Sequence, residues 1–139
     1  MKKPHVVTLF LAAITLLLSG CGSSAITAGL AVELAGIERT ETGATATLRY
    51  VNPNVAIYNI DRSEHKVYVD GALVGTISTK DAVGVPAQQA VTQDVALKLT
   101  KPLTPGEHSY RLESDCTLRL YADNMQGMKS TSSGSIVVK

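Results

Sequence analysis

Apolar and polar residues alternate along most of the chain beyond residue 29, and this is the pattern of β-strands that bury one face. In the stretch GLAVELAGIE the alternation places Leu30, Val32 and Leu34 on one face. In TGATATLRYVN the matching face holds Ala44, Ala46, Leu48 and Tyr50. A polar turn at residues 41–43 separates the two stretches, so we expect them to pair as a hairpin.

A second hairpin is expected at Asp70 and Gly71, which divide HKVYVDGALVGTIST into two apolar runs. The dipeptide Asp-Gly tolerates the positive φ angles that a tight two-residue turn requires. Beyond this hairpin, AVTQDVALKLT alternates again and predicts a further strand, with one face formed by Val91, Val95, Leu97 and Leu99.

The last third of the chain predicts strands whose ends are less definite. Pro102, Pro105 and Gly106 indicate a turn. The stretch EHSYRLESDCTLRLYAD that follows predicts either one long bent strand or two strands broken near residues 113–115. GMKSTSSGSIVVK is rich in serine and glycine, and it predicts a loop or hairpin before a last strand at residues 136–138.

No stretch beyond the first twenty residues repeats its apolar positions with a helical period. About seven short strands with turn signals between them predict an all-β fold, an antiparallel two-sheet β-sandwich. Lysines and arginines are scattered singly beyond residue 20, and without Lys2 and Lys3 the net charge falls from +1 to −1, so no basic surface for nucleic acid is expected. The chain has no Trp and only one Phe, which argues against aromatic platforms that stack sugars or bases.

The N-terminal residues have the order of a secretory signal peptide. Lys2 and Lys3 precede an apolar run over residues 6–18, and the small residues Ser19 and Gly20 follow. As a helix this run is about 20 Å long, shorter than the roughly 30 Å hydrocarbon layer of a bilayer. A cleaved signal is therefore favoured over a permanent transmembrane anchor.

Leu18-Ser19-Gly20-Cys21 resembles the lipobox of bacterial lipoproteins in all four positions. The resemblance implies that the signal peptide of residues 1–20 is removed and that Cys21 is acylated on its thiol and its new amino group. Two or more acyl chains anchor a protein stably where one does not. The alternative is an ordinary signal peptide that is cut later, near Ala25.

Residues 21–29 then form a flexible tether and residues 30–139 the folded domain. Gly22 stands where an Asp directs Gram-negative lipoproteins to the inner membrane. This favours the outer membrane, facing the periplasm, if the organism is Gram-negative.

The mature chain offers little reactive chemistry. Cys116 has no second cysteine to pair with, and it shares the parity of Leu118 and Leu120, so we expect a buried structural thiol and not a reactive one. His65 and His108 lie in polar stretches and are expected to be solvated. The three acidic residues that flank the Asp-Gly hairpin favour a charged turn over a calcium site; they are Asp61, Glu64 and Asp70. We expect no catalytic residue, metal, cofactor or small-molecule substrate.

The stretch RYVNPNVAIYNI interrupts a strand with Asn52-Pro53-Asn54. Proline cannot donate a ladder hydrogen bond and keeps the residue before it extended. Asn54 can close a turn with its own side chain. The motif is therefore expected to end one strand and redirect the chain. Nearby tyrosines can either pack in the core or line a binding patch, and core packing is favoured for Tyr50, Tyr58 and Tyr68.

Three ordered motifs resemble the LEA type 2 domain, also called the WHy domain. They are the Asn-Pro-Asn strand end, the glycine hairpin VYVDGALVGT and the proline loop with its valine-rich strand, VPAQQAVTQDVALKL; together they span roughly residues 30–103. Gln88 and Gln89 stand where small residues or glycine are common in that family. The resemblance implies an immunoglobulin- or fibronectin III-like sandwich, a link to water stress and desiccation, and no catalytic residues.

These features predict a lipid-anchored, non-enzymatic domain of the cell envelope with a stress-protective or interaction role, in which loops or strand edges contact envelope proteins or polymers. The alternative is an accessory or assembly lipoprotein that binds one specific envelope complex. A hydrolase or carbohydrate-binding domain would require an exposed groove with clustered carboxylates or tyrosines.

Overall fold

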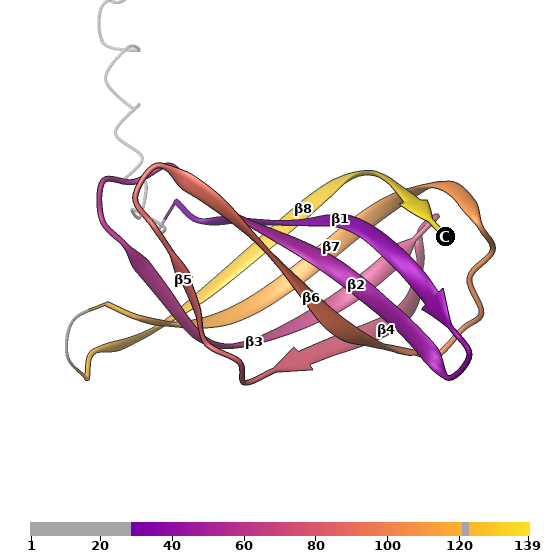
Figure 1. Cartoon of the computed structure of the whole chain (residues 1–139), viewed down its shortest axis with the longest axis horizontal. Helices are drawn as coiled ribbons and strands as arrows, with labels where there is room; N and C mark the ends of the chain where they lie inside the picture. Colours follow the sequence, from indigo (N-terminus) through magenta and orange to yellow (C-terminus); the bar gives the residue numbers. More distant parts are fainter. Residues whose placement is uncertain (1–28, 121–122) are drawn as a thin grey trace, which may run out of the picture.

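The computed structural model describes residues 29–120 and 123–139, and within these ranges the chain consists of strands and their connections (Figure 1). The eight strands are β1 (Ala31–Thr40), β2 (Gly43–Asn52), β3 (Tyr58–Val69), β4 (Ala72–Thr79), β5 (Val83–Val85), β6 (Gln89–Leu99), β7 (Gly106–Arg119) and β8 (Met125–Val138). The prediction of an all-β fold is confirmed. No helix in the described ranges has the length and apolar character needed to cross a membrane.

The predicted open sandwich is wrong, because the strands close into a seven-stranded mixed barrel. The hydrogen-bonded order is β4-β6-β2-β1-β8-β7-β3, and a pairing of β3 with β4 closes the ring. The short strand β5 pairs with β3 alone, in line with β4. The immunoglobulin- or fibronectin III-like arrangement implied by the family resemblance is wrong for the same reason. The barrel is mixed because β1 and β8 run parallel.

Two short seams join what would otherwise be separate sheets. At the first, β1 bridges β8 at Ile37 and Val138, and Lys139 N donates to Ile37 O at 2.9 Å. At the second, β4 bridges β6 at Gly75 and Leu99 and at one further pair. Sandwiches and barrels both bury one face of each strand, so the alternation in the sequence cannot distinguish them. Only these long-range pairings decide between the two folds.

The predicted hairpins form as expected. β1 pairs with β2 through the turn at residues 41–42, and the apolar faces predicted for both strands are buried. Asp70 and Gly71 join β3 to β4 with φ angles of 49° and 81°, the two positive values of a tight hairpin turn. β7 is one continuous strand of 14 residues, which was one of the two alternatives.

β8 is much longer than the three residues predicted. It pairs with β7 along its whole length, from Met125 opposite Arg119 to Val138 opposite Gly106. Serine and glycine have low strand preference, but the long partner strand provides backbone hydrogen bonds to every second residue. Tertiary pairing therefore outweighs the local composition that predicted a loop.

Gly75 lies at the closest approach in the seam between β4 and β6. A Cβ atom at this position would lie 2.5 Å from the carbonyl oxygen of Lys98 and 2.9 Å from Leu97 Cδ1. We predict that Gly75→Ala forces this seam apart and lowers the free energy of unfolding by about 1–3 kcal/mol. Urea denaturation of the purified domain measures the change.

Gly127→Ala in β8 is the matched control, because a Cβ there meets no atom within 4 Å. It should change the stability by no more than about 0.5 kcal/mol. Equal denaturation midpoints for the two variants would contradict the tight seam.

Candidate interaction site at the Asn-Pro-Asn end of the barrel

The described chain begins beside the Asn-Pro-Asn motif. A Cβ built on Gly29 would lie 3.5 Å from Asn54 Nδ2 and 3.7 Å from Pro53 Cγ. In Figure 1 this end of the barrel holds the β2–β3 and β5–β6 connections, and the C-terminus lies at the opposite end. Cys21, the signal peptide of residues 1–20 and the tether up to residue 28 lie outside the described residues, so acylation stays a prediction.

Asn52, the last residue of β2, holds this end of the barrel together. Its side chain is 1% exposed. The amide nitrogen Nδ2 donates toward three carbonyl oxygens, those of Ala56 at 2.8 Å, Val85 at 3.0 Å and Pro86 at 3.2 Å. The amide oxygen accepts from Asn54 N at 2.9 Å. One buried side chain thus closes the turn after β2 and ties it to the connection after β5.

A backbone contact completes the link between the two loops. Gln88 N donates to Asn54 O at 3.0 Å. Gln88 has φ of 56°, in the left-handed region that glycine and asparagine adopt more easily than glutamine. This is one of the positions where small residues are common in the family that the sequence resembles. We call the two joined loops, residues 53–57 and 86–88, the rim.

The rim carries the two most exposed large apolar side chains among the described residues. Val55 is 86% exposed and Ile57 is 61% exposed, whereas Val137, the next, is 51% exposed. The sequence around them has no charged residue from Val51 to Ile60, and the segment of β5 and β6 from residue 82 to 93 has none either. The rim is therefore an uncharged surface with two projecting aliphatic side chains, a feature that the sequence pattern did not predict.

His65 is buried, so the prediction of a solvated histidine is wrong. It is 2% exposed, with Nδ1 2.8 Å from Ser114 Oγ and Nε2 2.8 Å from Ser63 Oγ. Serine hydroxyls can donate or accept, so they satisfy a neutral ring. Burial lowers the pKa of His65 to about 4. The parity of His65 with Val67 and Val69 was the signal in the sequence that pointed to burial.

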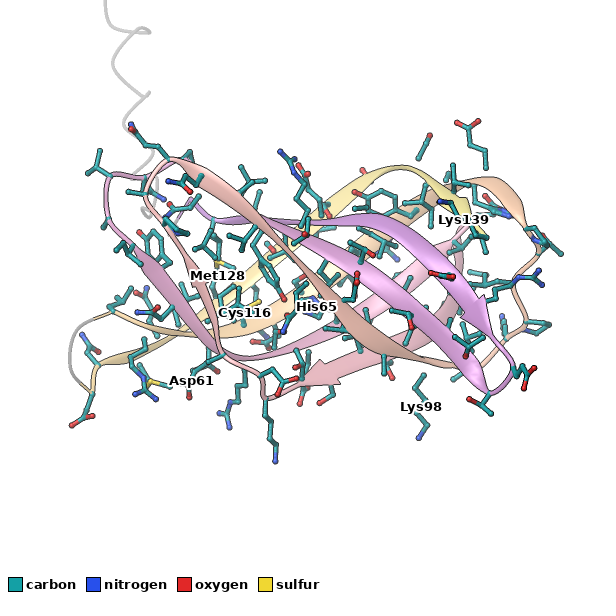
Figure 2. The ribbon with its side chains drawn as sticks, viewed as in Figure 1. Asp61, His65, Lys98, Cys116, Met128 and Lys139 are labelled. Atoms are coloured by element: carbon teal, nitrogen blue, oxygen red, sulfur yellow. The ribbon has the colours of Figure 1, made fainter. Side chains whose placement is uncertain are left out.

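Cys116 is fully buried near the same part of the interior, as predicted (Figure 2). Burial raises the pKa of its thiol to about 12. A thiol that stays protonated and enclosed is a poor nucleophile, so this cysteine acts as a small apolar side chain.

His108 lies at the opposite end of the barrel and is clamped in place, not freely solvated. Nδ1 lies 2.7 Å from Asp70 Oδ2 and Nε2 lies 2.9 Å from Thr104 O. Since both ring nitrogens face acceptors, the charged imidazolium is favoured, and the hydrogen bond to Asp70 raises the pKa of His108. The same contact lowers the pKa of Asp70.

The acidic residues near the Asp-Gly hairpin do not converge on a cation site. Asp61 forms an ion pair with Arg119 at 2.7 Å, and Asp70 is bound to His108. Among the described residues, no three side chains of the metal-binding types are grouped closely enough to hold an ion.

The tyrosines are divided between the inside and the outside of the barrel. Tyr50 is fully buried, its hydroxyl donates to Gln93 Oε1 at 3.2 Å, and burial raises its pKa to about 12. Tyr68 lies on the outer face, with the guanidinium of Arg111 3.9 Å above its ring. The predicted core packing therefore holds for Tyr50 and not for Tyr68, and no single tyrosine patch forms.

A shallow depression of about 730 Å³ covers the outer face of β3, β4, β7 and β8. Two of its carboxylates have basic neighbours, since Glu113 pairs with Arg111 and Asp115 lies 3.7 Å from Lys129.

Comparisons with known proteins give structural neighbours only. The sequence matches no protein-family model and no curated protein. A crystal structure of an Archaeoglobus fulgidus protein is 11% identical with a TM-score of 0.46, covering 79% of this chain and 95% of that one. An Arabidopsis thaliana protein is 16% identical with a TM-score of 0.49, covering 78% and 79%. A candidate late embryogenesis abundant (LEA) protein is 12% identical with a TM-score of 0.46, covering 94% and 78%.

At these identities and scores, the likeness transfers no activity and no residue role to this chain.

Replacing Asn52 should lower the stability of the protein strongly, because its side chain holds the rim together. Asn52→Ala leaves the carbonyl oxygens of Ala56 and Val85 without their donor, so we expect a loss of about 2–3 kcal/mol in the free energy of unfolding. Asn124→Ala, at an exposed asparagine of the β7–β8 hairpin, should leave it nearly unchanged. Urea denaturation measures both variants, and equal midpoints would show that the Asn52 amide does not hold the rim.

The buried histidine predicts a loss of stability in mild acid. The folded pKa of about 4 lies below the ordinary value of 6.5, so the unfolded chain binds a proton first as the pH falls. Stability should decline between about pH 6.5 and pH 4, by about 3 kcal/mol if His65 alone titrates. His65→Gln does not titrate and should flatten this decline in denaturation curves recorded across that range. An unchanged slope in the variant would contradict the assignment.

Proposed function

We propose that the protein is a lipid-anchored, non-enzymatic domain of the cell envelope that acts through contacts of its surface, with a stress-protective role. The observation that carries the proposal is the position of Gly29. It lies against the Asn-Pro-Asn motif only eight residues after the lipobox cysteine, Cys21. An anchor at Cys21 therefore attaches the domain to the membrane from the end of the barrel that carries the rim.

The absence of an enzymatic role is part of the proposal and has support in the interior of the barrel. His65 and its serine neighbours form a hydrogen-bonded group, and His65 is only 2% exposed. A general base must lie within hydrogen-bond distance of the proton that it removes from the substrate. The group is better explained as the polar filling of a closed barrel.

The stress-protective role rests on the three ordered motifs that resemble the LEA type 2 domain. For a Gram-negative organism we place the protein at the outer membrane, facing the periplasm, because Gly22 follows the acylated cysteine. An accessory role in one envelope complex is the rival proposal. Co-purification separates the two, because one stoichiometric partner favours the accessory role, whereas protection of many unrelated enzymes during drying favours the stress role.

We predict that Cys21→Ala moves the protein from the membrane fraction to the soluble fraction and leaves its far-UV circular dichroism unchanged. The thiol of Cys21 is the only attachment point for the diacylglycerol in this proposal. Mass spectrometry of the N-terminal peptide of the parent protein should show the acylated cysteine. Ser23→Ala, two residues along the chain, is the control and should stay in the membrane fraction. Continued membrane attachment of the Cys21→Ala protein would contradict the anchor.

A further inference from the structure

We infer that the rim is a lipid-contacting surface, and that Val55 and Ile57 enter the interfacial layer of the bilayer that holds the acyl chains. This inference rests on the proposed anchor at Cys21 and adds the orientation of the barrel on the membrane. The lipid contact is apolar and does not depend on charged headgroups.

Two aliphatic side chains are exposed on a loop whose conformation is fixed by hydrogen bonds. Val55 and Ile57 expose 86% and 61% of their surface. The hydrogen bonds of Asn52 to Ala56 O and to the β5–β6 connection hold the loop in this conformation. The loop therefore cannot fold back to bury the two side chains in its own barrel. Neighbouring exposed apolar residues of this kind mark surfaces that contact a partner or a membrane.

The described segments that form and flank the rim have no charged side chains. Residues 51–60 and 82–93 have no charged side chain, and neither do residues 20–32, which lead into the domain. A charged group placed in the interfacial layer loses hydration at a high cost in free energy, and the rim avoids this cost. The opposite end of the barrel differs, since it carries Asp70, Lys101 and Lys139 among other charges.

The neighbouring β7–β8 hairpin sets the limit of the contact. Arg119 at its base is paired with Asp61 at 2.7 Å, and Asp123 lies in its turn and is exposed. We therefore assign the lipid contact to the β2–β3 and β5–β6 connections and leave the hairpin in water.

Only a short segment of chain separates the rim from the proposed anchor at Cys21. Eight residues separate Cys21 from Gly29, and a chain segment of this length spans at most about 29 Å when fully extended. Gly29 itself lies beside Pro53 and Asn54 of the rim. The rim therefore stays within about 29 Å of the anchor, close to the membrane surface. A weak apolar contact is favoured under this confinement, because its effective concentration is high.

The chemistry of the rim favours lipid over a protein partner. Protein interfaces concentrate their binding energy in Trp, Tyr and Arg, and the rim has none of them. It also has no charge that would set the orientation of a protein partner. Branched aliphatic side chains on a neutral surface match the chemistry of the acyl boundary of a bilayer.

A single fluorescent reporter tests the inference, because the chain has no tryptophan. The acylated Ile57→Trp protein is reconstituted into phosphatidylcholine vesicles whose acyl chains carry bromine. We expect a blue-shifted emission and strong quenching. The matched reporter is Thr42→Trp, at the exposed β1–β2 turn at the other end of the barrel, and it should show neither change. Mass spectrometry of the Cys21 peptide verifies acylation in both samples.

The outcomes separate the inference from the proposed anchor. If both proteins are acylated and bound to vesicles but the two reporters respond alike, the lipid contact is overturned and the anchor stands. If the Ile57→Trp reporter is shielded in native membranes and not in vesicles, a protein covers the rim and the lipid assignment is overturned. If Cys21 carries no acyl group, the anchor and the inference fail together.

Discussion

The buried side-chain amide of Asn52 is the contact on which the structure of the rim depends. It is placed where β2 ends, and it replaces the backbone partners that Pro53 and the following residues can no longer provide. Its oxygen closes the turn, and its nitrogen reaches the carbonyl oxygen of Ala56 in one connection and that of Pro86 in the other. Because these groups are satisfied inside the protein, the aliphatic side chains of the same loop can be held outward.

Closure of the barrel determines which residues are available to solvent at all. Long hairpins build most of the sheet, but two short seams, at Ile37 with Val138 and at Gly75 with Leu99, turn it into a ring. A ring has few free strand edges, which lowers the capacity of the protein to bind partners by adding strands. The connections at the ends then become the natural contact surfaces. We therefore propose that the rim, and not the side of the sheet, makes the functional contact.

Local chemistry in the sequence predicted the hairpins well, because their turns and faces are set by neighbours along the chain. The Asp70-Gly71 turn and the buried parity of Leu30, Val32 and Leu34 are of this kind. Ring closure was not predictable, since it depends on pairings between distant strands that leave no periodic signal. The first eleven residues of β8, before the predicted strand at residues 136–138, were missed because its partner strand, and not its serine-rich composition, makes them a strand.

The candidate site was predicted in part. Asn52, Pro53 and Asn54 indicated where the chain turns, but the tertiary partners of Asn52 depend on β5 and the turn at Gln88, whose positions no local pattern gives. Exposure of Val55 and Ile57 follows from the same contacts, and so it could not be read from an apolar stretch that resembles a buried strand. The prediction for His65 failed in the opposite direction. Its polar neighbours suggested exposure to solvent, although the alternation of the strand placed it on the buried face.

Hydrogen–deuterium exchange tests most directly whether the rim faces the membrane. One sample is the acylated protein on vesicles, and the other is the Cys21→Ala variant in detergent-free solution. We expect the backbone amides of residues 54–57 and 87–88 to exchange more slowly on the membrane. The exchange rates in the turns at residues 41–42 and 70–71 should be the same in both samples. Equal exchange at the rim in both samples, or slowing confined to the opposite end, would contradict the orientation of the barrel described above.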